Sequence, residues 1–198
     1  MAAPSADDIR ELHEKYAPSA EAFDRVFTHC EIVGTIAEQL IAVSDCGVDA
    51  DLVRAGCLLH DIGVYRLYDR DGVLDQQNYV RHGVLGHEIL VDEGFPEELG
   101  RFCSCHTGVG LTKQDVERQR LPLPPADYLA ATAEEQLVMY ADKFHTKTTP
   151  PKFVTADSYA TYISRFGDDK VAAFQALRNT FGAPDLAELA AAHQHALA

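Results

Sequence analysis

Residues 55–63 read AGCLLHDIG, an apolar run that continues at once into the dipeptide His60-Asp61. An imidazole nitrogen beside a carboxylate oxygen is the ligand pair that iron, manganese, zinc or nickel takes from a protein. One such dipeptide is a weak indication of a metal site. The residues on either side of it in the sequence therefore decide whether a metal is expected.

Further ligand-type residues lie on both sides of the dipeptide, each on a stretch that reads as helix. Their positions on or beside the apolar helix faces indicate that they point inward, as His29 does in the row Val26, His29, Val33. A single inward histidine is more often a hydrogen-bonded core residue. Because an unpaired buried carboxylate is costly, two aspartates among four inward histidines favour cations between them. We predict six ligands from five helices: His29, His60, Asp61, His82, His106 and Asp142.

The remaining histidines are not expected to bind metal. His87 lies five residues after His82 and is rotated away from its face, so we predict a place at the surface or behind a ligand. His145 follows Asp142 by three residues and is a candidate to support a ligand from behind. His13, His193 and His195 lie in terminal helices and are expected to be solvated.

Composition and charge narrow the class of protein. Of 198 residues, 46% are hydrophobic and 24% are charged, as in an ordinary globular protein. The net charge of −14 disfavours long nucleic acids as partners but permits a small anionic substrate beside a bound metal. No apolar stretch approaches the ~20 residues that span a bilayer, and the N-terminal MAAPSADD does not resemble a signal peptide. The five cysteines have no disulfide or zinc-finger spacing, so we expect reduced thiols and a cytoplasmic protein without membrane contact.

Helical periodicity recurs along the chain, and no strand pattern or internal repeat is evident. Capping and breaking residues predict helices over about 6–16, 19–46, 50–60, 79–91, 96–106, 132–144, 157–165, 168–181 and 185–195. The segment from Thr107 to Tyr128 is rich in glycine and proline. We expect it to be irregular and to act as a lid over a site.

These motifs resemble those of the HD-domain superfamily of metal-dependent phosphohydrolases. The run His60-Asp-Ile-Gly63 matches its HDIG subgroup, and the segments HGVLG (82–86), CHTG (105–108) and YADK (140–143) resemble its later motifs. The resemblance covers about residues 20–146. It implies an all-α HD-domain helical bundle formed by a single domain, residues 1–198, with a C-terminal helical extension over about 150–198.

The resemblance also implies roles for the six ligands. His29, His60, Asp61 and Asp142 would hold one metal ion, and His82 and His106 would hold a second, with Asp61 bridging the two. Cys105 stands where many relatives have a histidine. The implied reaction is hydrolysis of a small phosphate ester or anhydride, such as a nucleotide, by a hydroxide that bridges the metals. Asp61 and Lys143 are the residues expected to act in catalysis, and Arg66, Arg81 and Lys113 are further candidates for phosphate contact.

Three positions depart from the cyclic-dinucleotide phosphodiesterases of the superfamily. Val64 stands where those enzymes usually carry a lysine, no Gly-Tyr-Pro follows His106, and Arg25 replaces a glutamate that supports a third metal. Hydrolysis of cyclic-di-GMP is therefore not expected.

Two other functions fit the same residues. Some HD-fold proteins with this ligand order use a mixed-valent di-iron pair to activate oxygen. A non-catalytic nucleotide-binding module is the third reading, although such a module has no need of an open two-metal centre. The substrate and the oligomeric state are left open by the sequence.

Overall fold

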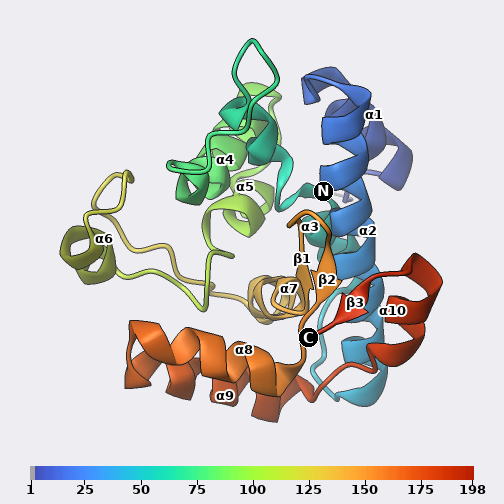
Figure 1. Ribbon diagram of the computed structural model, residues 1–198, viewed down its shortest axis with the longest axis vertical. Helices are drawn as coiled ribbons and strands as arrows, with labels where there is room; N and C mark the ends of the chain where they lie inside the picture. Colours follow the sequence, from blue (N-terminus) through green and yellow to red (C-terminus); the bar gives the residue numbers. More distant parts are fainter. Residues whose placement is uncertain (1–2) are drawn as a thin grey trace.

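The computed structural model describes residues 3–198 and is built almost entirely of helices, so the predicted all-α bundle is confirmed (Figure 1). The α-helices are α1 (Ala6–Tyr16), α2 (Ala20–Val43), α3 (Ala50–Leu59), α4 (His82–Asp92), α5 (Glu97–Ser104), α6 (Lys113–Gln119), α7 (Ala133–Asp142), α8 (Ala156–Ile163), α9 (Asp168–Phe181) and α10 (Ala187–His193). The 3-10 helices are η1 (Ile62–Leu67), η2 (Tyr79–Arg81) and η3 (Ser164–Phe166). The strands are β1 (His145–Thr146), β2 (Lys152–Phe153) and β3 (Ala196–Leu197).

Helix α2 is the longest of the described elements and packs against α1, α3, α7, α9 and β1. The Ser19 side chain caps its first turn by accepting a hydrogen bond from the Ala22 N–H. Val26, Val33 and Leu40 are fully buried along the face that packs against α3 and α7. By length and composition α2 could cross a membrane, which corrects the expectation that no stretch is long and apolar enough. Half of its most apolar window is buried inside the bundle, and the core helix of a globular domain passes the same test.

Close backbone contacts explain the glycines of the HDIG and HGVLG segments. A Cβ atom on Gly63 would lie 2.0 Å from the His82 carbonyl oxygen and 2.2 Å from the Gly86 nitrogen. A Cβ atom on Gly83 would lie 2.6 Å from the Cys103 carbonyl oxygen. No side chain fits in either place, so these glycines let η1, α4 and α5 approach closely. This packing is what brings His82 and His106 to Asp61.

The C-terminal segment folds back over the bundle. Strand β2 pairs with β1 in antiparallel and with β3 in parallel orientation. Helices α8 and α9 lie together along one side of the bundle, at the bottom of Figure 1, where Tyr140 of α7 donates a hydrogen bond to the Gly182 carbonyl. The C-terminal extension thus packs on the same helix that carries Asp142.

The structure corrects four expectations. The segment 107–128 is not irregular throughout, because α6 forms behind a capping box of Thr112 and Asp115. Three strands of two residues each are present, too short to give a periodic pattern. His13 is not solvated: it is fully buried, with hydrogen bonds to the Tyr65 hydroxyl and the Leu58 carbonyl. His195 is half-buried. The expectation about the N-terminus includes Met1 and Ala2, which lie outside the described residues.

Candidate metal centre

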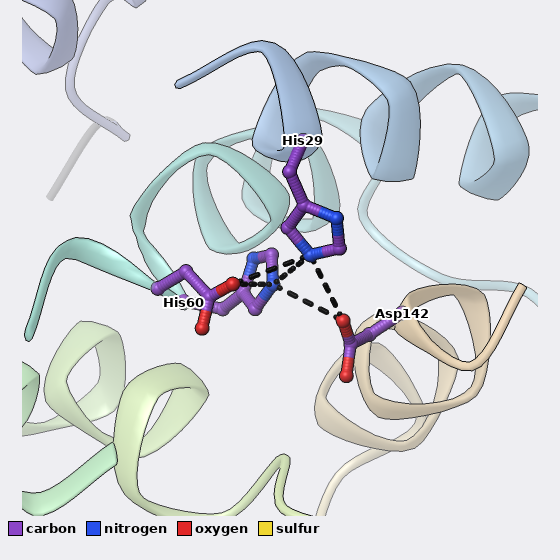
Figure 2. Close-up of side chains that lie close together, drawn as sticks. His29, His60 and Asp142 are labelled. Carbon is purple, nitrogen blue, oxygen red and sulfur yellow. Dashed lines mark hydrogen bonds and ion pairs between the residues drawn. The ribbon is translucent and has the colours of Figure 1, made fainter. Parts of the chain in front are cut away.

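The structure brings all six predicted ligand residues together at the centre of the bundle. They form two groups, in each of which the ligand atoms lie within 4.8 Å of one another. The first group is His29, His60, Asp61 and Asp142, and the second is Asp61, His82 and His106. Figure 2 shows His29, His60 and Asp142 pointing toward one another from α2, the end of α3 and the end of α7. Metal binding by these groups stays a prediction, and their geometry can be tested against it.

The first test is the orientation of the imidazole rings. Each histidine directs Nε2 into the centre and hydrogen-bonds through Nδ1 to a group behind it. The Nδ1 partners are the Cys57 carbonyl for His60 (2.7 Å), the Tyr79 carbonyl for His82 (2.6 Å), the Cys103 carbonyl for His106 (2.7 Å) and the His145 Nδ1 for His29 (2.9 Å). A carbonyl can only accept, so His60, His82 and His106 carry their proton on Nδ1 when neutral. Their Nε2 lone pairs then face inward, as in metal-ligating histidines.

The second test is how close these nitrogens come to one another. His82 Nε2 lies 2.9 Å from His106 Nε2, and His60 Nε2 lies 3.3 Å from His29 Nε2. Two unprotonated nitrogens at such distances repel unless a cation or a proton lies between them. Burial lowers the pKa of His82 to about 3 and also lowers the pKa of His106, so protons are a poor solution for this pair. The His82–His106 pair therefore fits a metal ion. Between His29 and His60 a proton can take that place, because the Asp61 carboxylate and the other groups around His60 together outweigh burial and raise the pKa of His60 well above its ordinary value.

Asp61 belongs to both groups through different oxygens. Its Oδ2 lies 3.2 Å from His29 Nε2 and 3.3 Å from His60 Nε2. Its Oδ1 lies 3.4 Å from His82 Nε2 and has no hydrogen-bond partner among residues 3–198, although it is fully buried. An orphaned buried carboxylate oxygen is costly, and a cation would compensate it. Asp61 thus has the position of a bridge between two ions.

Each of the two ligand aspartates, Asp61 and Asp142, also forms an ion pair with a lysine. Lys143 donates to Asp142 Oδ2 at 2.6 Å, and Lys147 donates to Asp61 Oδ2. Burial alone would raise the pKa of Asp61, but the charge of the Lys147 ammonium holds it well below its usual range. Burial would likewise raise the pKa of Asp142, and the Lys143 ammonium holds it well below. Both carboxylates are therefore ionised and ready to bind a cation.

Lys147 was not singled out as a site residue from the sequence, because it lies beyond the end of α7. The only signal was its place in the segment KFHTK (143–147), which continues the YADK motif with a second lysine. The two-residue strand β1 turns this segment back toward Asp61. No periodicity in the sequence could have predicted that turn.

His145 supports a ligand from behind, which agrees with the sequence-based expectation. Its Nδ1 lies 2.9 Å from His29 Nδ1, and its Nε2 lies 3.1 Å from His195 Nδ1. With His29 Nε2 facing the centre, His29 Nδ1 donates and His145 Nδ1 accepts, which leaves the His145 Nε2 proton for His195. The row of three histidines fixes the tautomer and ring orientation of His29.

The second group and the end of α7 open on a cavity of about 780 Å³. His82, His106, Asp142, Lys143 and Lys147 line it, whereas His29, His60 and Asp61 do not. Segment 107–121 forms one side of this cavity, and Lys170 of α9 ties it down through Asp115 (2.6 Å) and the Gly110 carbonyl (2.8 Å). The segment therefore lines one side of the site and is held there by a buried ion pair, and its action as a lid stays a prediction.

Several candidate residues lie elsewhere. Arg66 forms surface ion pairs with Glu88 and Asp92, and Lys113 is exposed. Neither of these residues lines the cavity, and Arg81 does not line it either. The Cys105 thiol contacts Ser104 and belongs to neither ligand group. His87 contacts Ser104 and Glu97, away from both groups. Of the four cations proposed for phosphate contact, the structure brings Lys143 alone to the cavity.

Comparison with known proteins agrees with this geometry. The family model described as HD domain matches residues 26–147. An uncharacterized protein of Methanocaldococcus jannaschii, MJ0778, is 42% identical over 129 residues, which are 63% of this chain and 69% of that protein. A tRNA (cytidine(56)-2'-O)-methyltransferase of Picrophilus torridus is 36% identical over 63% of this chain, which matches only 32% of the methyltransferase.

Solved structures show the same fold. The HD domain of the L. monocytogenes phosphodiesterase PgpH aligns with 93% of this chain and 98% of its own, with a TM-score of 0.56 and 18% identity. Its complex with cyclic-di-AMP aligns with a TM-score of 0.55 over 95% of this chain and 98% of its own, also at 18% identity. With the family model matching more than half of its length, and the His and Asp motifs meeting in one buried centre, this chain belongs to the HD-domain family, a superfamily of metal-dependent hydrolases.

Proposed function

We propose that this protein hydrolyses a small phosphate ester or anhydride, with a nucleotide as the first substrate class to test. The observation that carries the proposal is that Asp61 is shared by two ligand groups, one of which faces a cavity lined by Lys143 and Lys147. A pair of divalent ions at such a centre supplies activation of water near neutral pH and neutralises charge on phosphate oxygens. Iron, manganese, zinc and nickel all suit this mixture of imidazole and carboxylate.

The chain's own residues have distinct parts in this proposal. His29, His60 and Asp142 would hold one ion, His82 and His106 the other, and Asp61 would bridge them. The ammonium groups of Lys143 and Lys147 line the cavity beside the ligands, so a phosphate placed there can accept their hydrogen bonds. Both ammonium groups also lie against ligand carboxylates and keep those carboxylates ionised.

The nucleotide is proposed on two grounds. The PgpH structure was solved with cyclic-di-AMP, and a cavity of about 780 Å³ is large enough for a nucleotide. The methyltransferase of Picrophilus torridus matches this chain over about a third of its own length, so its activity on tRNA is no part of the proposal.

A substrate screen tests the proposal. Protein reconstituted with manganese or iron is incubated with nucleotides and simple phosphoesters, and both phosphate release and metal content are measured. Phosphate release that depends on added metal and disappears in Asp61→Ala is the expected result. Ligands recovered unaltered, or oxygen uptake with a mixed-valent iron signal and no phosphate release, would contradict it.

A further inference from the structure

The lining of the cavity contains two chemically different sets of residues. One set consists of the ligand residues and Lys143 and Lys147, as described above. The other set follows β2 and is mostly apolar and aromatic, with Ser158 and Lys170 beside Val154, Tyr159, Tyr162, Ile163 and Phe166. The residues of this second set lie outside residues 26–147, the range that matches the family model. The C-terminal extension therefore adds an apolar and aromatic wall to a site whose motifs lie in the HD domain.

Two rings of this wall are accessible. Tyr162 is 46% exposed although it is a large apolar side chain, and Phe166 is half-buried. Their ring centroids lie 5.9 Å apart, and the Arg165 guanidinium lies over the Tyr162 ring at 4.2 Å from its centroid. Leu111 and Leu121 of the covering segment line the same cavity. Rings that remain open to a cavity between apolar walls can stack on a planar apolar group.

A third lysine of the lining, Lys152, lies between these two sets in the sequence. Lys152 on β2 pairs in register with Thr146 on β1, which is next to Lys147. Lys152 is exposed, lines the cavity and makes no ion pair within residues 3–198. Two residues later Val154 begins the apolar wall. An anionic group bound near the metal ligands and an apolar ring bound near η3 would therefore both find matching surface in one cavity.

We propose that α8 and η3 form a subsite for the planar ring of a phosphorylated substrate, with the ring against Tyr162 and Phe166 and the phosphate at the metal-ligand end. This subsite rests on the proposed phosphohydrolase function and makes the substrate a ring-bearing phosphate monoester of the nucleoside monophosphate class. Tyr162 and Phe166 are then residues that determine specificity. They follow residue 147, where the match to the family model ends, and the proposal gives them no part in the hydrolysis itself.

The test compares a ligand that has the ring with one that lacks it. Adenosine 5′-monophosphate and ribose 5-phosphate are titrated calorimetrically into the protein as purified, and each ligand is recovered and checked for cleavage. Wild-type protein should prefer the nucleotide by roughly tenfold, the order that a stacked base contributes. Tyr162→Ala and Phe166→Ala should each move the ratio of the two affinities toward one, while Tyr162→Phe should keep it. Tyr68→Ala, an aromatic truncation outside the cavity, is the matched control.

Equal affinity of wild-type protein for the two ligands, including no binding of either, would overturn the subsite. So would an affinity ratio that Tyr162→Ala and Phe166→Ala both leave unchanged while the variants melt like wild type. A preference for the nucleotide would support the subsite whether or not the nucleotide is cleaved. If the same protein, once reconstituted with manganese, still leaves the nucleotide intact, that result counts against the hydrolase. Cleavage of both phosphates at equal efficiency would support the hydrolase and remove the subsite.

Discussion

The two ligand groups that share Asp61 differ in charge and in exposure. The first group contains two carboxylates, and its histidines, His29 and His60, are at most 1% exposed and do not line the cavity. The second group contains one carboxylate oxygen, and its histidines, His82 and His106, line the cavity. More negative charge and less contact with solvent favour tight binding of a cation. We expect the first group to hold its ion firmly and the second to present an exchangeable ion to the substrate.

Removing Asp61 should have the largest effect, because it would abolish the feature that the two groups share. Asp61→Ala should lose both metal ions, and hydrolysis should fall by at least about 10³-fold, since the metals supply several kcal/mol of stabilisation. Metal content by mass spectrometry and phosphate release are measured together. Asp45→Ala, at an exposed aspartate outside both groups, is the control. Unchanged metal content and turnover in Asp61→Ala would sink the two-metal interpretation.

Removing one histidine from each ligand group should show which of the two metal-binding steps belongs to which group. His82→Ala should keep one firmly bound ion per chain and lose roughly 10²-fold in turnover, because the first group is intact and the cavity-facing ion is lost. His29→Ala should instead weaken the tighter of two binding steps in a metal titration. His87→Ala, on the same helix as His82 but in neither group, should behave as wild type. If His82→Ala and His29→Ala weaken the same binding step, the proposed difference between the groups is wrong.

Replacing Lys143 or Lys147 tests whether its ammonium group binds the phosphate of the substrate. Lys143→Met and Lys147→Met should each reduce kcat/KM by roughly 10-fold to 100-fold, the order of one lost hydrogen bond to a charged group. Metal binding should be kept, because removing an ammonium group raises the pKa of the carboxyl beside it but also removes a cation that competes with the metal. Lys113→Met, at an exposed lysine outside the cavity, is the control. Loss of metal from either site variant would show that the lysine supports the fold of the centre instead.

Removing the support behind His29 should have the smallest effect, and one confined to the first group. His145→Ala should weaken metal affinity of that group by about tenfold, the lower end of what partners behind a ligand contribute. His145→Asn, whose carbonyl can still accept from His29 Nδ1, should recover part of it. Competition with a chromophoric chelator measures the affinity. An equal weakening of both binding steps would mean that His145 acts through general stability.

The sequence predicted the six ligand residues because each belongs to a short motif on a helical stretch. His60-Asp61 and Asp142 stand in short motifs, and the inward face of His29 follows from helical periodicity. These features depend on residues close together in the sequence. The order of the α-helices, except for α6, was predictable for the same reason.

What the sequence did not reveal depends on contacts between distant segments. His13 finds its buried partners 45 and 52 residues away, so nothing around it indicates burial. Lys147 reaches Asp61 only because β1 turns back, and Tyr162 reaches the cavity only because the C-terminal extension folds over it. Helix α6 was missed because its seven residues are mostly polar and lie between glycines and prolines.

Anomalous X-ray diffraction from crystals loaded with manganese tests the central claim most directly, because it locates each ion independently of activity. The bridging role of Asp61 predicts two anomalous peaks about 3.5–4 Å apart, with one Asp61 oxygen directed at each. The peak at His29, His60 and Asp142 should persist when the metal concentration is lowered, and the peak at His82 and His106 should fade first. A single peak that spares one group, or peaks away from Asp61, would contradict a two-metal centre built on this residue.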